Sequence, residues 1–390
     1  MDLRNEQSKL SITYEKLAKF LVSALNFWTF DCGQSFSAGK IRGRNFIFLV
    51  ILLVSSVINI RNVIESYYRS IRIIWTINVA WSCVHSMAIT KLLAIIFYKR
   101  EFLKLLKDFQ KIISEQQNRH IAAIQIPKMK KTISRIILSL IIYGTIFCLS
   151  ELFTLIYVLN YPGVNFPLIY EIRELLAFGE TFFFFFNMIF QSICFLILLL
   201  HILVNDFLLL FFGFLFHAVI QILAEIIEKC LYKDIFGIEP NILKIIIEKH
   251  LQIINLLKTL DKIFRKLSLA NLLTNFLCLI IIFCGILFQE EFEGSLYMIA
   301  LILMFQTFAL SLFGEILAVN TGNIGDSLYL TEWYAMPLRE QTSILFMMRL
   351  GQKTYGIKAG GLVAISFNTF VDVIKASMSY CALLYALTKN

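Results

Sequence analysis

Seven long apolar stretches constrain this 390-residue chain more than any other feature of its sequence. A helix needs about 20 apolar residues to cross the hydrocarbon core of a bilayer. The stretches that meet or nearly meet this length lie at 45–60, 71–97, 132–159, 181–204, 271–288, 295–317 and 361–387. The sequence therefore predicts an all-α integral membrane protein with seven transmembrane helices.

Composition agrees with this fold class. Hydrophobic residues make up 58% of the chain and charged residues only 16%, which is far from the soluble norm. The first 40 residues contain no short apolar run followed by a small-residue cleavage site, so a removable signal peptide is not expected. We expect the first spanning helix to direct insertion.

The orientation follows from where Lys and Arg lie between the apolar stretches. Arg72 and Arg135 lie at the ends of their stretches and are counted with the adjoining loops. Alternate connecting segments then hold 29 Lys and Arg residues on one side of the membrane and 5 on the other, and only Lys91 and Lys375 are left inside stretches. Basic loops stay in the cytoplasm during insertion. The count predicts a cytoplasmic N-terminus and, because seven is odd, an extracellular C-terminus. It also explains the net charge of +9 without nucleic acid as a partner.

Two helices are expected to project beyond the membrane. The fourth apolar stretch continues to about Leu223, and the only candidate for a turn is Asn205-Asp206. Residues 241–267 carry apolar side chains at helical spacing with lysines between them, directly before the fifth stretch. This segment suits either a surface helix beside lipid headgroups or a helix packed on partner subunits. Together the extensions predict a cytoplasmic anchor layer.

The sequence offers no chemistry of an enzyme. The eight cysteines are scattered without metal-ligand spacing, which favours small buried side chains over a disulfide or metal framework. HExxH, GxSxG and phosphate-binding glycine motifs are all missing from the sequence. We expect no catalytic residues, no metal site and no cofactor.

Three blocks in the last third of the chain resemble the insect odorant receptor family. The first is EKHLQIINLLKTLDKIFRKLSLANLL, with His250 and Asp261 where family members carry a His and an acidic residue. The second is Leu312-Phe313-Gly314-Glu315 followed by LYLTEWYAMP. The third is MMRLGQKTYGIKAGGLVAISFNTFVDVIKASMSYCALLYAL, which is similar to the family's last helix. Gustatory receptors share the topology, but Gly-Ile-Lys-Ala-Gly-Gly after Thr354-Tyr355 favours the odorant branch.

The resemblance implies a ligand-gated, non-selective cation channel of four subunits in the plasma membrane of a sensory neuron dendrite. Most family members assemble with a shared co-receptor, which has a cytoplasmic insertion that this chain lacks, so the chain resembles an odorant-specific subunit. Residues 1–240 would hold the first four membrane helices and the ligand pocket. Residues 241–390 would hold the anchor helix, the last three membrane helices and the pore. Expected partners are a small apolar volatile ligand, the co-receptor and membrane lipid.

The last helix is where the resemblance places the gate. The residues that match the family's gate positions are Tyr380, Leu383, Leu384 and Leu387. Leu383 and Leu387 are one helical turn apart, and a ring of such side chains can close a pore by excluding water. Asp372 and Lys375 could form an ion pair within the helix, or either could line the conduction path.

The family's ligand pocket lies among the second, third, fourth and sixth spans, in the outer part of the bilayer. Apolar ligands need aromatic and aliphatic walls with a few polar groups. The candidates at this depth are Trp75, Asn78, Trp81, Ser82, Tyr143, Phe147, Glu151, Phe183, Phe186, Asn187, Phe190, Met298, Leu301 and Phe305. Asn78, Glu151 and Asn187 are the most informative, because a polar group in hydrocarbon needs a partner or a cavity.

Other functions remain open from sequence alone. A gustatory-type ligand-gated channel shares the topology. A secondary transporter could also use seven spans, although no internal repeat with broken helices is visible. An inverted receptor that signals without conducting is a further alternative.

Overall fold

A computed structural model describes residues 3–29, 43–68, 72–114, 119–160, 180–232, 242–288, 294–353 and 355–389. Almost all of these residues are helical. The elements are α1 (Leu3–Thr29), α2 (Gly43–Tyr68), α3 (Arg72–Ser114), α4 (Arg119–Asn160), α6 (Glu180–Tyr232), α7 (Ile242–Leu287), α8 (Gly294–Tyr329), the 3-10 turn η2 (Trp333–Ala335), α9 (Leu338–Gly351), β1 (Lys358–Ala359), β2 (Val363–Ala364) and α10 (Phe367–Lys389).

Each of the seven predicted stretches overlaps a different helix, namely α2, α3, α4, α6, α7, α8 and α10. Among the described residues, α3, α6, α7, α8 and α10 contain segments long and apolar enough to cross a membrane, and α2 has a shorter apolar segment at Val50–Arg61. The predicted all-α membrane architecture is confirmed.

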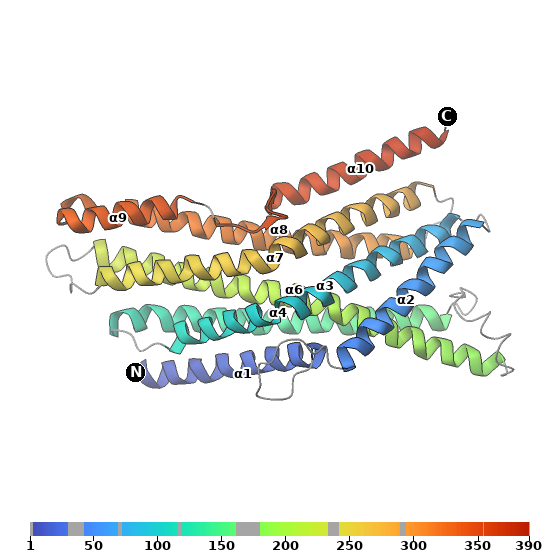
Figure 1. Cartoon of the computed structure of the whole chain (residues 1–390), viewed down its shortest axis with the longest axis horizontal. Coiled ribbons are helices and arrows are strands. Elements are labelled where there is room, and N and C mark those ends of the chain that lie inside the picture. Colours follow the sequence, from blue (N-terminus) through green and yellow to red (C-terminus); the bar gives the residue numbers. More distant parts are fainter. Residues whose placement is uncertain are drawn as a thin grey trace.

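The helices run along one long axis, and the two ends of the chain lie toward its opposite ends (Figure 1). Helix α6 has 53 residues and α7 has 46. At 1.5 Å per residue these helices are about 80 and 70 Å long, more than twice the ~30 Å hydrocarbon core. A large part of each must therefore lie outside the membrane.

The predicted extension of the fourth span is confirmed, because α6 passes through Asn205-Asp206 without a turn. Its segment Val204–Lys229 is apolar enough to span a membrane, yet 72% of the most apolar part is buried inside the chain. Protein rather than lipid covers these side chains. Hydropathy alone could not separate the two environments.

Phenylalanine side chains form the centre of the largest hydrophobic core. Phe102 and Phe109 of α3, Phe212 of α6 and Phe264 of α7 are all buried. Phe102 stacks on Phe212 with ring centroids 6.0 Å apart and meets Phe264 edge-on at 5.9 Å. Such aromatic pairs contribute about 0.5–1.5 kcal/mol beyond the burial of their area. The core therefore joins three helices that are distant in sequence.

Helix α1 covers one side of this core. Tyr14 is fully buried, and its hydroxyl donates to the carbonyl of Leu106 at 3.0 Å. Burial raises the pKa of Tyr14 well above its ordinary value. The N-terminal segment, which has too many charges to suit a span, is thus a helix packed against this core.

The predicted seventh span begins too early. Residues 361–366 belong to a β-hairpin turn and to the cap of α10, which starts only at Phe367. The two short strands pair Lys358 with Ala364 and Ala359 with Val363. Gly360 and Gly361 take positive φ values of 62° and 81°, which turn the chain here. Of the apolar residues in this segment, Ile365 is buried, whereas Leu362 and Val363 are exposed.

Candidate functional site

Helix α10 stands at the edge of the bundle and diverges from it toward the C-terminus (Figure 1). It has the length and composition of a membrane span, but only 11% of its most apolar window is buried inside the chain. A helix with this much uncovered apolar surface needs further cover from lipid or other subunits.

The predicted gate residues lie on this uncovered helix. Tyr380, Leu383, Leu384 and Leu387 are 53%, 56%, 44% and 66% exposed. Tyr380 also meets Phe276 of α7 edge-on, with ring centroids 5.9 Å apart. The structure therefore places the four side chains where they are free to face a pore, and their role as a gate stays a prediction.

Asp372 and Lys375 lie nearer the start of α10 and are both exposed. No ion pair joins these two described residues. The internal ion pair that their spacing allows is therefore not formed. Both charged groups are free to contact water, another subunit or the conduction path.

Two predicted pocket residues, Asn78 and Ser82 of α3, lie against α2. The Asn59 side-chain amide donates to the Asn78 carbonyl at 3.2 Å and to the Ser82 hydroxyl at 3.1 Å. One turn away, the Ser55 hydroxyl and His85 Nε2 are 2.8 Å apart. These contacts supply the partners that polar groups in a membrane helix require. Asn78 and Ser82 thus join α2 to α3, whatever they contribute to a pocket.

The other predicted pocket residues are either partly exposed or have side chains outside the described part of the structure. Trp75, Leu301 and Phe305 are 36%, 60% and 51% exposed in the isolated chain. The remaining candidates have side chains outside the described part of the structure: Trp81, Tyr143, Phe147, Glu151, Phe183, Phe186, Asn187, Phe190 and Met298. The proposed pocket therefore remains a prediction.

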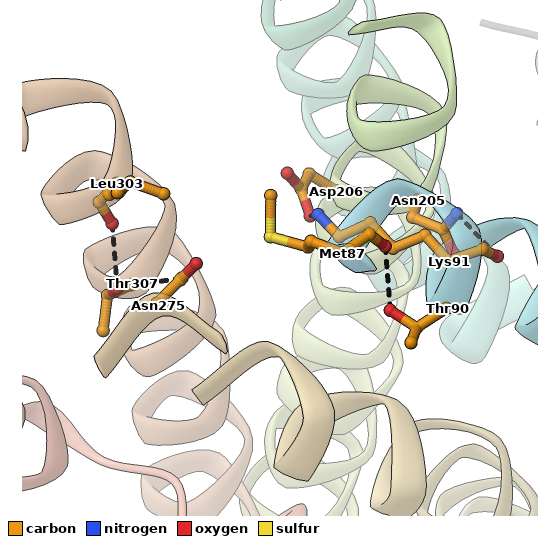
Figure 2. A network of polar contacts seen from close by, with 8 residues as sticks. All are labelled: Met87, Thr90, Lys91, Asn205, Asp206, Asn275, Leu303 and Thr307. Atoms are coloured by element: carbon orange, nitrogen blue, oxygen red, sulfur yellow. Dashed lines mark hydrogen bonds and ion pairs between the residues drawn. The ribbon is translucent and has the colours of Figure 1, made fainter. Parts of the chain in front are cut away.

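A buried ion pair joins α3 to α6 (Figure 2). The Lys91 ammonium donates to Asp206 Oδ1 at 2.7 Å, and the two side chains are 1% and 17% exposed. The neighbouring Asn205 amide donates to the Lys91 carbonyl at 3.2 Å. An unpaired charge in this environment would cost several kcal/mol, so any shift of the two helices that separates this pair is unfavourable.

A second polar contact in Figure 2 joins α7 to α8. The Asn275 amide donates to the Thr307 hydroxyl at 3.1 Å, and Thr307 donates to the Leu303 carbonyl at 2.8 Å. Asn271 precedes Asn275 by one turn on the same buried face of α7. This face keeps α7 in contact with α8 close to the start of α10.

Helix α7 also packs directly on α3. The Cys278 thiol points to the Ala80 carbonyl at 3.7 Å. At Gly285, a Cβ would come within 2.5 Å of the Thr76 methyl group, so only glycine permits this approach. Since α7 also carries Phe276 against Tyr380, it lies between a helix of the predicted pocket and the helix of the predicted gate.

Metal or disulfide chemistry finds no support among the described residues. No group of three or more His, Cys, Asp or Glu side chains there is placed to hold a metal ion. Cys83, Cys194, Cys278, Cys284 and Cys381 are free thiols. Cys194, Cys278 and Cys381 are buried, whereas Cys83 and Cys284 are half-buried.

The residues that were not predicted from the sequence are mostly the hydrogen-bond or ion-pair partners of residues that were. Lys91 stood out as a charge inside a span, but nothing in the sequence linked it to Asp206, 115 positions later. Asn59 and Ser55 could have been found, because they are polar residues four apart within an apolar stretch.

Comparisons with known proteins point in one direction. A family model described as "7tm Odorant receptor" matches residues 72–378. Odorant receptor 49a of Drosophila melanogaster is 28% identical over 142 residues, which are 36% of each chain. Odorant receptor 85c of the same species is 23% identical over 168 residues, or 42% of each chain. The matches thus span well under half the length of these relatives.

Solved structures agree over a greater length. The olfactory receptor OR5 of the insect Machilis hrabei, in complex with eugenol, aligns with a TM-score of 0.75 at 12% identity, covering 97% of this chain and 99% of that chain. A second structure of the same receptor aligns with a TM-score of 0.74, covering 96% of this chain and 98% of that chain. At these identities the match establishes a shared fold.

Proposed function

Since this chain belongs to the odorant receptor family, we propose that it is the odorant-specific subunit of a ligand-gated, non-selective cation channel. The span of the family match carries the proposal. Residues 72–378 run from the start of α3 to a point just before the predicted gate, so the match includes the helices of the predicted pocket and the first half of α10. Membership also identifies the chain as a receptor and not an enzyme.

Helix α10 is proposed to line the pore. Its apolar surface is left uncovered by the rest of the chain, and four such helices around an axis would cover one another. Rings of Leu383 and Leu387 with Tyr380 and Leu384 would then exclude water and close the channel.

The ligand is proposed to be a small, apolar volatile compound held among α3, α4, α6 and α8. The Machilis receptor with the same fold was solved in complex with eugenol, an aromatic compound of this kind. The predicted pocket is rich in aromatic side chains, which suit such ligands. Contact of α7 with both α3 and α10 gives pocket and gate a shared neighbour.

Assembly with the shared co-receptor subunit in a tetramer is part of the proposal, as is a place in the plasma membrane of a sensory dendrite. The charge distribution supports a cytoplasmic N-terminus and an extracellular C-terminus. Epitope tags at the two ends test this: in intact cells the C-terminal tag should bind antibody and the N-terminal tag should not. The reverse labelling would overturn the orientation.

Current recording tests the function directly. Cells expressing the chain with a co-receptor should show inward cation current on exposure to eugenol or to a panel of apolar esters, terpenes and aromatics. Accumulation of a labelled compound without current would instead indicate a transporter. Ligand-evoked signalling with no conductance would indicate a non-conducting receptor.

Substitution of aromatic side chains tests the pocket. Trp81→Ala, Phe186→Ala and Phe190→Ala should change the order of ligand preference while surface expression stays unchanged. Loss of expression would show that these side chains serve helix packing.

A further inference from the structure

The start of α10 is attached to the rest of the chain by two carboxylates from two different helices. Asp261 lies on α7 and Glu315 lies on α8. Each accepts a hydrogen bond from a backbone N–H in the segment that leads into α10. Both residues lie in the sequence blocks that resemble the odorant receptors, and neither belongs to the proposed pocket or gate.

On the α7 side, Asp261 holds the hairpin. Its Oδ1 accepts from the Lys358 N–H at 3.3 Å, and its Oδ2 is paired with the Arg265 guanidinium. The Gly360 N–H donates to the Arg265 carbonyl at 2.9 Å. A Cβ on Gly360 would lie 2.8 Å from Leu269 Cδ2, so the hairpin turn rests directly on the surface of α7.

On the α8 side, Gly314 and Glu315 contact the end of the hairpin. A Cβ on Gly314 would lie 2.3 Å from the Ile365 carbonyl oxygen, so the two backbones touch. Glu315 Oε2 accepts from the Phe367 N–H at 3.2 Å. Phe367 is the first residue of α10, and its N–H is one of the donors that a helix start leaves without an internal partner.

The Glu315 bond adds to a cap that α10 already has. Ser366 Oγ accepts from the Thr369 N–H at 3.4 Å, and Thr369 Oγ1 accepts from the Ser366 N–H at 3.3 Å. This reciprocal capping makes the first turn without help from α8. Glu315 therefore contributes attachment: it ties the positive end of the α10 dipole to another helix.

We infer that Glu315 and Asp261 are positioning residues for the pore helix. They fix the start of α10 to α8 and α7, so a displacement of α7 or α8 changes the tilt of α10 and moves the distant Leu383 and Leu387. This inference rests on the proposed function only in its last step, because the attachment itself exists whether or not α10 lines a pore.

Hydrogen exchange of the first turn of α10 tests the attachment. In the purified full-length receptor, Glu315→Ala should speed exchange in the peptide that contains Phe367 by about tenfold, the effect expected from losing a hydrogen bond to a charged group. Glu315→Gln should largely restore protection, because its amide oxygen still accepts from the Phe367 N–H. Glu315→Asp should not, because the shorter side chain loses reach.

Asp326→Ala is the matched control. Asp326 is exposed on α8, about three turns beyond Glu315. The Asp326→Ala substitution should leave the exchange of the peptide that contains Phe367 unchanged. If Glu315→Ala fails to fold, the comparison of Glu315→Gln with Glu315→Asp decides instead. Equal exchange in wild type, Glu315→Gln and Glu315→Asp would overturn the attachment. Asp261→Ala should speed exchange in the peptide that contains Lys358 and Gly360, as an independent second variant.

Thiol labelling tests the consequence for the gate. In a Leu383→Cys background, with the wild-type chain as control for native cysteines, a membrane-impermeant methanethiosulfonate cation reports access from outside. Adding Glu315→Ala should raise the modification rate about threefold or more, and adding Glu315→Gln should not. Faster exchange with an unchanged modification rate would overturn the positioning role. If residue 383 is unreactive in every background, the proposed pore fails while the exchange result stands.

Discussion

The Lys91 ammonium and the Asp206 carboxylate show how much a single pair of residues can hold in this fold. Lys91 is 1% exposed, and its ammonium group contacts the Asp206 carboxylate at 2.7 Å. Breaking a buried pair by removing one partner costs about 3–5 kcal/mol, because the other charge stays buried.

We therefore predict that Lys91→Met and Asp206→Asn each lower the melting temperature of the purified receptor sharply. The double variant Lys91→Met/Asp206→Asn should recover most of the loss, because no charge remains unpaired. Lys128→Met is a suitable control, since its pair with Glu225 is partly exposed. Additive losses in the double variant would show that the two charges do not depend on each other.

His250 predicts a pH dependence of stability. It lies on α7 well before the predicted span at 271–288, is 2% exposed, and has a buried Nδ1 atom with no hydrogen-bond partner among the residues that the structure describes. Burial lowers the pKa of His250 to about 4. Between about pH 6.5 and pH 4 the unfolded chain binds a proton that the folded chain does not, so stability falls as the pH falls.

Thermal unfolding of the receptor across this range should show a slope of up to roughly 1.4 kcal/mol per pH unit from this residue. His250→Gln should remove that part of the slope. An unchanged slope in the variant would show that other groups cause the acid sensitivity.

At the scale of elements, close approach of helices depends on a few glycines. A Cβ on Gly213 of α6 would lie 2.4 Å from Cδ2 of Phe313, a ring that is 1% exposed and has no room to move. A Cβ on Gly322 of α8 would have nothing within 4 Å.

Gly213→Ala should thus lower the melting temperature, since overpacking costs about 1–3 kcal/mol. Gly322→Ala should raise it slightly, because alanine favours the helix by about 1 kcal/mol over glycine. The matched pair is read by thermal unfolding of purified receptor. A gain in stability at both positions would contradict the tight packing of α6 on α8.

Element positions were the part of the fold best predicted from sequence. Each predicted apolar stretch overlaps a different helix, and the preference for one projecting helix over a turn at Asn205-Asp206 is confirmed by the continuous α6. The start of α10 was misplaced because glycine and apolar residues at 361–366 suit both a span and a tight hairpin. Hydropathy measures how readily a segment enters lipid, and it does not distinguish a helical backbone from a hairpin turn.

Contacts between side chains on different helices could not be predicted from the sequence. Asn78 was expected to matter through its polar side chain, whereas the contact described at this position is a hydrogen bond from the Asn59 side-chain amide on the preceding helix to the Asn78 backbone carbonyl. Contacts such as Lys91 with Asp206 or Glu315 with Phe367 depend on how helices far apart in the sequence are rotated about their axes. A single sequence contains no direct record of that rotation.

At the scale of the whole molecule, the isolated chain is incomplete around α10. Its four gate candidates are 44–66% exposed, although this apolar helix has the composition of a membrane span. In the proposed tetramer these side chains meet around one axis.

Leu383→Ala and Leu387→Ala should therefore raise the current that flows without ligand, because a wider and less apolar ring hydrates more readily. Whole-cell recording with a co-receptor measures this. Leu338→Ala, at an exposed position of α9, serves as control and should leave basal current unchanged. Unchanged basal conductance in both gate variants would remove Leu383 and Leu387 from the gate.

The unbroken length of α3, α4, α6 and α7, with 42 to 53 residues each, bears on how such a chain can evolve. One inserted residue would turn everything beyond it by about 100° and shift it by 1.5 Å, taking every partner on one half of the helix out of place. Substitutions carry no such penalty. Drift should therefore accumulate in residue identity while helix lengths stay fixed. The Machilis receptor shares this fold over 97% of the chain at only 12% sequence identity.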